Sequence, residues 1–138
     1  LCYQLKATMK KVEKYIGQEL NHYGVNLAQS FVILSLLEND GATLSEIGLR
    51  AQIENSSLTT MVDKLEKENL VERRSYPQDR RVIRLFLTDK GREVGNKLLE
   101  AGLTFNSYLE KNISIPAGDF LKALEEVANS IDKLQESQ

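Results

Sequence analysis

The segment from Ala42 to Thr88 constrains the fold most, because start signals for two short helices are followed directly by a basic hairpin. Thr43 and Glu46 form a capping box. The Thr43 hydroxyl can accept a hydrogen bond from the backbone N–H of Glu46, and the Glu46 carboxylate can accept one from the N–H of Thr43. We therefore expect a helix to begin near Leu44.

A second helix follows the short break at residues 52–54. Asn55 or Ser56 is expected to cap it, and it should end near Asn69. Its apolar residues are spaced so that they share one buried stripe: Leu58, Val62 and Leu65. Outside that stripe lie short hydroxyl and charged side chains: Ser56, Ser57, Thr59, Thr60, Asp63, Lys64 and Lys67. This pattern suits a recognition helix, because the N-terminal end of such a helix must approach base edges and phosphates closely.

A two-stranded hairpin is predicted next. One strand covers residues 70–75 and the other residues 82–87, and residues 76–81 form the tip, with Pro77 and Asp79 as turn-forming residues. In the second strand, alternate side chains fall on opposite faces: Ile83, Leu85 and Leu87 on one, and Val82, Arg84 and Phe86 on the other. A basic hairpin beside a helix-turn-helix is typical of a wing.

The N-terminal part of the chain predicts two further helices. Residues 1–23 form an amphipathic helix, which Gly24 can end in a left-handed conformation. Asn26 and Gln29 form the capping box of the next helix. Its main buried stripe is expected to be Leu27, Phe31, Leu34 and Leu37, widened by Val32, Ile33 and Leu36.

Two more amphipathic helices follow the hairpin. Thr88 caps the first, and the break at residues 112–116 ends it, because Pro116 disfavours helix at the preceding residue and can sit in the first turn of the next helix. The last helix repeats apolar residues every four and three positions: Phe120, Leu124, Val127, Ile131 and Leu134. The terminal helices bury little against so small a middle segment. A second copy of the chain would cover them, as in obligate dimers, which bury about 1,000 Å² or more of surface.

Composition indicates one globular domain. The chain has 138 residues, of which 41% are apolar and 28% charged. No run of about 18 or more apolar residues predicts a membrane span, and no signal-peptide pattern is present. The single Cys2 cannot form an internal disulfide, which fits the reducing cytoplasm, where we expect the protein to act.

The distribution of charge favours a nucleic-acid partner, although the net charge is −2. Residues 55–92 carry nine Lys or Arg against six Asp or Glu, a local charge of +3. Steering of a charged partner depends on the local field within roughly one Debye length, about 8 Å at physiological salt. The alternative is a solvated hairpin with a few extra arginines.

Neither metal nor enzyme chemistry is predicted. His22 is the only histidine, and no cluster of Cys and His could bind a metal. We find no Ser-His-Asp order, glycine-rich phosphate loop or paired carboxylates, so no cofactor and no catalytic residue are expected.

Three motifs in and after the hairpin are specific. Leu70-Val71-Glu72-Arg73, then Pro77-x-Asp79-x-Arg81, then Leu85-x-Leu87-Thr88-x-x-Gly91 resemble the signature of the multiple antibiotic resistance regulator (MarR) family of winged-helix transcription regulators. Residues 57–66 are similar to the recognition helix of that family. The resemblance extends over the whole chain in the order and length of the helices.

The resemblance implies a single MarR-like domain over residues 1–138, mainly α with a β-hairpin wing. Residues 27–88 would form the winged helix-turn-helix that binds DNA. Residues 1–26 and 89–138 would supply dimerisation helices. Such a homodimer presents two recognition helices roughly 34 Å apart, so double-stranded DNA with a pseudo-palindromic operator is the expected partner.

The resemblance also assigns roles to single residues. Arg81 matches the wing arginine that enters the minor groove, and Arg80 could replace it if the tip is turned differently. Phosphate contact or plain surface is expected of three further arginines: Arg73, Arg74 and Arg84. Contacts to bases and phosphates are expected from Ser56, Ser57, Thr59, Thr60 and Lys64, of which Thr60 stands where many family members have arginine. Asp79 should shape the tip or pair with an arginine, and Asp63 should hold its helix against a wing arginine.

The signal that controls such a regulator stays open. In the family, a small aromatic or phenolic ligand often releases a repressor from DNA, and Tyr15, Tyr23 and Phe31 are candidate pocket residues. Cys2 is similar to the thiol of the peroxide-sensing branch, and the alternative is a small apolar residue that only packs. A winged helix that binds protein instead of DNA is the second class of function.

Overall fold

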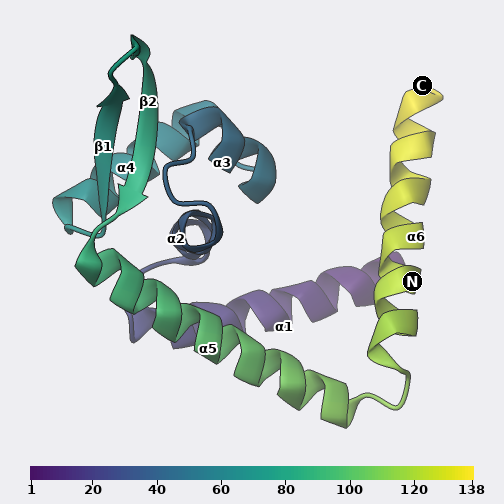
Figure 1. The fold of residues 1–138 in the computed structure, drawn as a ribbon. Helices are drawn as coiled ribbons and strands as arrows, with labels where there is room; N and C mark the ends of the chain where they lie inside the picture. Colours follow the sequence, from purple (N-terminus) through teal and green to yellow (C-terminus); the bar gives the residue numbers. More distant parts are fainter. The chain divides into compact units, whose positions relative to one another are not determined.

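The computed structural model describes residues 1–138 and divides them into two compact units, Leu1–Glu100 and Ala101–Gln138. The chain is mainly helical with one two-stranded antiparallel hairpin, which confirms the predicted fold class (Figure 1). In chain order, the elements are α1 (Cys2–Asn21), α2 (Leu27–Glu38), α3 (Leu44–Ala51), α4 (Asn55–Lys67), β1 (Val71–Tyr76), β2 (Asp79–Leu87), α5 (Asp89–Asn112) and α6 (Ala117–Glu136).

Both predicted capping boxes are present. The Asn26 side chain accepts from the N–H of Gln29, and the Gln29 side chain accepts from the N–H of Asn26, each at 2.9 Å. The Thr43 hydroxyl accepts from the N–H of Glu46 at 3.2 Å, and the Glu46 carboxylate accepts from the N–H of Thr43 at 3.0 Å. Local side-chain chemistry therefore sets the first residues of α2 and α3.

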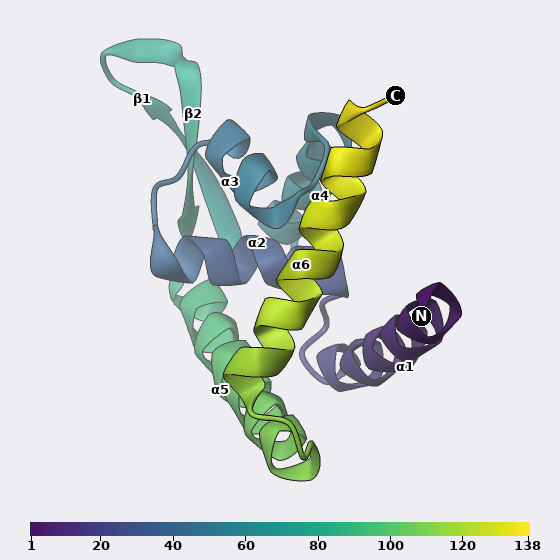
Figure 2. The ribbon, with the colours of Figure 1, turned by 90° about the vertical axis from the view of Figure 1, so that its right-hand side faces the viewer.

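Helix α2 lies at the centre of the first unit's core. It contacts α1, α3, α4 and β2, and Figure 2 shows the hairpin projecting beyond the helices around it. Its buried apolar side chains are Val32, Ile33 and Leu36, whereas Phe31, predicted in the main buried stripe, is 46% exposed. That prediction was wrong because α2 is apolar around most of its circumference. The elements that contact α2 select the buried face, and periodicity alone does not.

The predicted stripe of α4 is confirmed, and its predicted cap is wrong. Leu58, Val62 and Leu65 are fully buried. The helix begins at Asn55, and Glu54 occupies the N-cap position without a side-chain hydrogen bond. Glu54 takes this place because its carbonyl already accepts the first helical hydrogen bond of α4, from the N–H of Leu58 at 2.9 Å.

The hairpin is longer than predicted and has a bulge near its tip. The strands pair in register as far as Ser75. There the register shifts, because Tyr76 pairs with Asp79 and residues 80–82 have no opposite partner in β1. The turn itself consists only of residues 77–78. Such bulges twist a strand and redirect its side chains.

The base of the hairpin is bound to the loop before α3. Gly41 takes a positive φ of 85° and donates its N–H to the carbonyl of Leu85 at 2.8 Å. The N–H of Leu85 donates to the carbonyl of Ala42 at 2.9 Å, and the N–H of Leu87 donates to the Asp40 carboxylate at 2.9 Å. The loop therefore pairs with β2 through an isolated antiparallel bridge, in which Thr43 lies opposite Arg84.

Helix α5 starts against the chain that leaves α4. The Thr88 hydroxyl accepts from the N–H of Gly91 at 2.9 Å, which confirms the predicted cap, and donates to the carbonyl of Asn69 at 2.6 Å. A β-carbon on Gly91 would lie 1.9 Å from the carbonyl oxygen of Leu70. The Leu-Thr-x-x-Gly motif is thus the sequence that allows this close approach.

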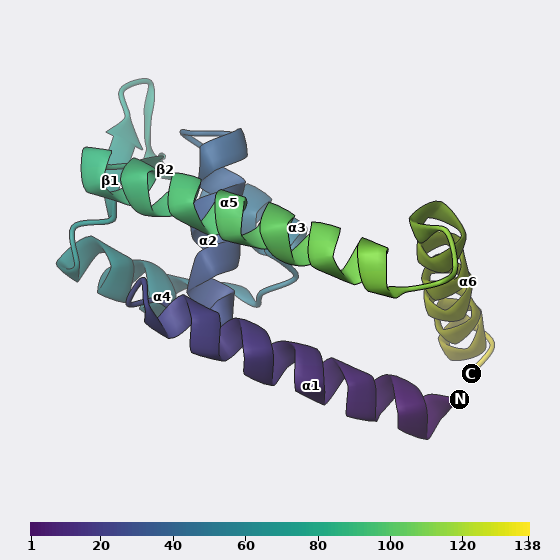
Figure 3. The same ribbon diagram turned by 90° about the horizontal axis from the view of Figure 1, so that it is seen from below.

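Both units expose apolar side chains on helices. In α1, contact with the core is made around Ile16 and Leu20, while Tyr3 and Met9 are exposed. Figure 3 shows the ribbon of α1 along its length. In the second unit, α6 begins after Pro116, which occupies the N-cap position, and none of its residues is buried. No helix combines the length and the apolar character needed to cross a membrane.

Candidate nucleic-acid interface

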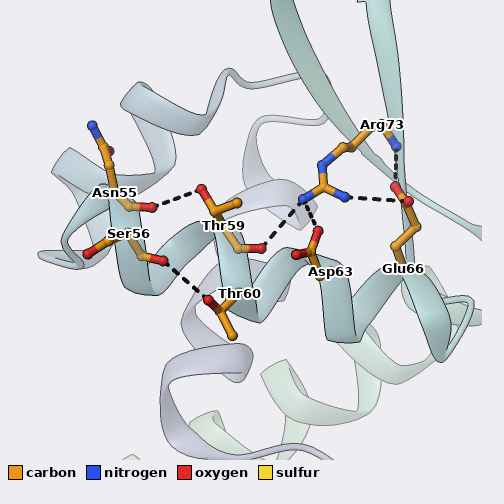
Figure 4. Close-up of polar contacts among 7 residues, drawn as sticks. All are labelled: Asn55, Ser56, Thr59, Thr60, Asp63, Glu66 and Arg73. Atoms are coloured by element: carbon orange, nitrogen blue, oxygen red, sulfur yellow. Dashed lines mark hydrogen bonds and ion pairs between the residues drawn. The ribbon is translucent and has the colours of Figure 1, made fainter.

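Helix α4 presents a polar face to solvent, as its sequence predicts. The exposed residues are Asn55, Ser56, Ser57, Thr59, Thr60, Asp63, Lys64, Glu66 and Lys67. Figure 4 shows six of them along the helix, from Asn55 to Glu66. Because the buried stripe fixes the opposite side of α4 in the core, this face cannot turn inward.

The two threonines on this face direct their hydroxyls toward their own helix. The Thr59 hydroxyl donates to the carbonyl of Asn55 at 3.0 Å (Figure 4). The Thr60 hydroxyl makes a longer contact of 3.4 Å with the carbonyl of Ser56. Such bonds to the preceding turn are a common conformation of threonine in helices.

Arg73 connects the hairpin to this helix. Its guanidinium lies 2.5 Å from the Asp63 carboxylate and 3.4 Å from the Glu66 carboxylate, and it donates to the carbonyl of Thr59 at 3.5 Å (Figure 4). The Arg73 side chain is only 24% exposed. Arg73 is therefore more than plain surface, while its contact with phosphate stays a prediction, and Asp63 contacts a hairpin arginine.

The tip of the hairpin carries the most accessible cation among the paired arginines. The side chain of Arg81 is 93% exposed, and its Nε lies 3.3 Å from the Asp79 carboxylate. Asp79 also accepts from the backbone N–H of Arg81 at 3.0 Å, so it shapes the tip and pairs with an arginine as expected. Arg80 is exposed beside them. The irregular segment of β2 thus carries two consecutive exposed arginines at the tip of the hairpin.

Two further arginines differ in their surroundings. Arg74 is exposed, pairs with Glu72 and lies over the ring of Phe86, 4.1 Å from its centroid. Arg84 donates to the carbonyl of Gly41 at 2.9 Å and lies 5.1 Å from the ring centroid of Tyr76. The Nε of Arg84 is buried and has no hydrogen-bond partner. Arg84 therefore connects the hairpin to the loop before α3 and is more than plain surface, while its contact with phosphate stays a prediction.

The residues predicted for signal sensing lie apart from the α4 face. Cys2 is exposed at the first residue of α1. Tyr15 and Phe31 are 45% and 46% exposed, and Tyr23 packs partly against the core. A cavity of about 70 Å³ lies elsewhere, between α2 and α3, and is lined by Ser35, Asn39, Ala42, Glu46, Ile47 and Arg50. None of the three aromatic candidates lines this cavity.

Sequence reasoning missed two partners. Glu66 was not assigned a role, although its position three residues after Asp63 places both carboxylates on one side of α4, where a single arginine can reach them. Gly41 contributes a carbonyl to Arg84, and no sequence pattern marks a backbone carbonyl as a partner 43 positions away.

The winged-helix region matches one protein family. The model of the MarR family matches residues 25–83, which include α2, α3, α4, β1 and the tip of the hairpin. This part of the chain is therefore similar to the MarR family.

Two curated transcription regulators are similar to the chain in sequence. The chain is 39% identical over 87 residues to the HTH-type transcriptional repressor MdtR of Bacillus subtilis. This match covers 63% of the chain and 56% of MdtR, so the chain spans little more than half the length of that relative. The chain is 27% identical over 109 residues to the HTH-type transcriptional regulator SarZ of Staphylococcus epidermidis. This match covers 78% of the chain and 74% of SarZ.

Solved structures agree in fold. The structure of reduced AbfR bound to DNA superposes with a TM-score of 0.79 at 23% identity and covers 96% of this chain and 90% of AbfR. The structure of YusO from Bacillus subtilis gives a TM-score of 0.65 at 29% identity and covers 94% of this chain and 91% of YusO. The winged helix with long flanking helices is therefore shared along almost the whole chain.

Proposed function

We propose that this protein is a regulator of the MarR kind, a homodimer that binds specific DNA sequences in the cytoplasm and acts as a repressor. The observation that carries the proposal is the exposed hydroxyl-rich face of α4, which Arg73 ties to a hairpin with two exposed arginines at its tip. A transcriptional repressor among its relatives, MdtR, supports the same function.

In this proposal, α4 enters the major groove and the tip of the hairpin follows the backbone into the minor groove. The N-terminal residues of a recognition helix contact base edges, and arginine is favoured in a narrow minor groove by its negative potential. Arg81 is the main candidate there, with Arg80 beside it. Arg74 and Lys64 are exposed and can contact phosphates.

Dimerisation would cover the apolar faces of the terminal helices. On α6, Leu121, Ile131 and Leu134 are each more than half exposed. Two copies that bury such faces would reach the roughly 1,000 Å² of a specific interface and would present two α4 helices to one side of a duplex. The expected operator is pseudo-palindromic, with half-sites about one helical turn apart.

A small aromatic or phenolic ligand is proposed to release the repressor. To do so, it must bind the free and the DNA-bound arrangements with different affinity. Tyr15 and Phe31 support this role, since each leaves about half of its side chain exposed.

Cys2 favours a second candidate signal, because its thiol is exposed. A peroxide sensor would lose operator affinity after hydroperoxide treatment, and Cys2→Ser would keep it. An unchanged affinity of the treated wild type would exclude this signal.

The proposal is tested by selecting bound duplexes from randomised DNA at physiological salt. An enriched palindrome supports it. If binding is weak and independent of sequence, a winged helix with a protein partner becomes the better reading. On the selected operator, log affinity should fall with log salt concentration by about 0.9 for each neutralised phosphate. If the Arg81 side chain neutralises a phosphate, Arg81→Ala should reduce that slope by about one unit. Lys10→Ala on α1 is the matched control and should leave the slope unchanged.

A further inference from the structure

The first two turns of α4 lack the residues that usually recognise guanine. Residues 55–60 are Asn-Ser-Ser-Leu-Thr-Thr, and the first basic side chain of the helix is Lys64. Guanine is most often recognised in the major groove by Arg or Lys, which donates to its O6 and N7 atoms. Direct contact with bases from the N-terminal end of α4 must therefore come from short side chains.

Among these short side chains, the threonines differ from the serines. The hydroxyl protons of Thr59 and Thr60 point to carbonyls of the preceding turn, at 3.0 Å and 3.4 Å (Figure 4). Both residues are exposed. Because each hydroxyl donates within the helix, the methyl group is the part of the side chain left to contact a partner. The surface offered to a base edge at these two positions is thus mainly apolar.

The contact with Arg73 fixes where these methyl groups lie. Its guanidinium reaches the carbonyl of Thr59 and the carboxylate of Asp63, so the middle of α4 is held against β1. A methyl group recognises a base only if its position is fixed to within a fraction of an ångström. Both threonines stand on a helix whose opposite side is fully buried through Leu58 and Val62.

We propose that Thr59 and Thr60 recognise thymine through contact between their methyl groups and the C5-methyl group of the base. Thymine is the only DNA base with an apolar group in the major groove, and the threonine methyl is a known partner for it. This inference rests on the proposed function, because it assumes that α4 enters the major groove. It predicts that each half-site carries thymine at base pairs that face the first two turns of α4.

The test compares thymine with uracil, which lacks only the C5-methyl group. The operator obtained from random selection is synthesised with deoxyuridine in place of thymidine within the half-sites. As a control, the same replacement is made in the flanking sequence. Burying one methyl group corresponds to about a fourfold change in affinity. We expect a loss of about fourfold for each thymine that contacts a threonine, and no change for the flanking replacement.

Variants then separate the methyl group from the hydroxyl. Thr59→Ser and Thr60→Ser remove the methyl group, so each should abolish its share of the preference for thymine over uracil. Thr59→Val and Thr60→Val remove the hydroxyl and should keep that preference. Serine, threonine and valine have similar helix propensities, so α4 should stay intact. Thr8→Ser on α1 is the matched control and should leave the preference unchanged.

The outcomes distinguish this inference from the proposed function. If no duplex is enriched, the proposed function fails and the inference falls with it. If a palindrome is enriched but its half-sites lack thymine, or if thymine and uracil operators bind equally, the regulator stands and thymine recognition is overturned. The same conclusion follows if the serine variants keep the full preference or the valine variants lose it.

Discussion

Replacing Gly91 by alanine should destabilise the protein strongly. The added β-carbon would lie 1.9 Å from the carbonyl oxygen of Leu70 and 2.9 Å from its carbonyl carbon. Both are backbone atoms, so no side-chain rotation can relieve the overlap. The start of α5 would have to move away from Leu70 by about an ångström or more.

The loss of unfolding free energy can be estimated from the contacts between the start of α5 and Leu70. Overpacking in a tight site typically costs about 1–3 kcal/mol. The displacement also weakens the bonds from Thr88 to Leu70 at 3.1 Å and to Asn69 at 2.6 Å, each worth about 1 kcal/mol. Alanine regains at most about 1 kcal/mol over glycine in helix propensity. The net loss of unfolding free energy is therefore about 2–4 kcal/mol.

Urea unfolding followed by circular dichroism measures this change at a fixed protein concentration, since dimerisation contributes to stability. The matched control is Gly102→Ala in the same helix, where a β-carbon meets nothing within 4 Å. The control should be unchanged or more stable by up to about 1 kcal/mol. If Gly91→Ala were as stable as Gly102→Ala, the close approach of α5 to Leu70 would be refuted.

Three further changes test separate parts of the structure. Asp63→Asn should lower the unfolding free energy by no more than about 1 kcal/mol, because the ion pair with Arg73 is partly exposed. The same change should reduce the free energy of operator binding by more than this loss of stability. If a double-mutant cycle with Arg73→Gln shows no coupling in operator binding, the role of the Arg73–Asp63 ion pair in positioning α4 is contradicted. Thr43→Val removes the cap of α3 and should cost about 1 kcal/mol in urea unfolding, whereas an unchanged midpoint would deny the capping box a role. Leu124→Glu on α6 should shift the protein from dimer to monomer in analytical ultracentrifugation, and a dimer of unchanged affinity would exclude that face.

Part of the interface could be predicted from sequence because its determinants are local. The stripe of α4 depends only on residues three and four positions apart, so burial of Leu58, Val62 and Leu65 implies exposure of the hydroxyl face. The tip geometry of Asp79 is also local, since its carboxylate bonds to an N–H two residues later. By contrast, Arg73, Arg74 and Arg84 look alike in the sequence, and only their neighbours in space distinguish them.

The sequence by itself determined where α2, α3 and α5 begin, because capping side chains bond to N–H groups three residues away. Only the tertiary structure decided that Arg84 turns to the carbonyl of Gly41 and that Phe31 stays half exposed. It also decided that residues 80–82 bulge from the ladder. The physical reason is distance along the chain. The hydrogen bonds of a helix cap and the spacing of a buried stripe involve residues within one or two turns. The partner of a guanidinium group, or the side of a helix that is buried, depends instead on which remote segments pack against it.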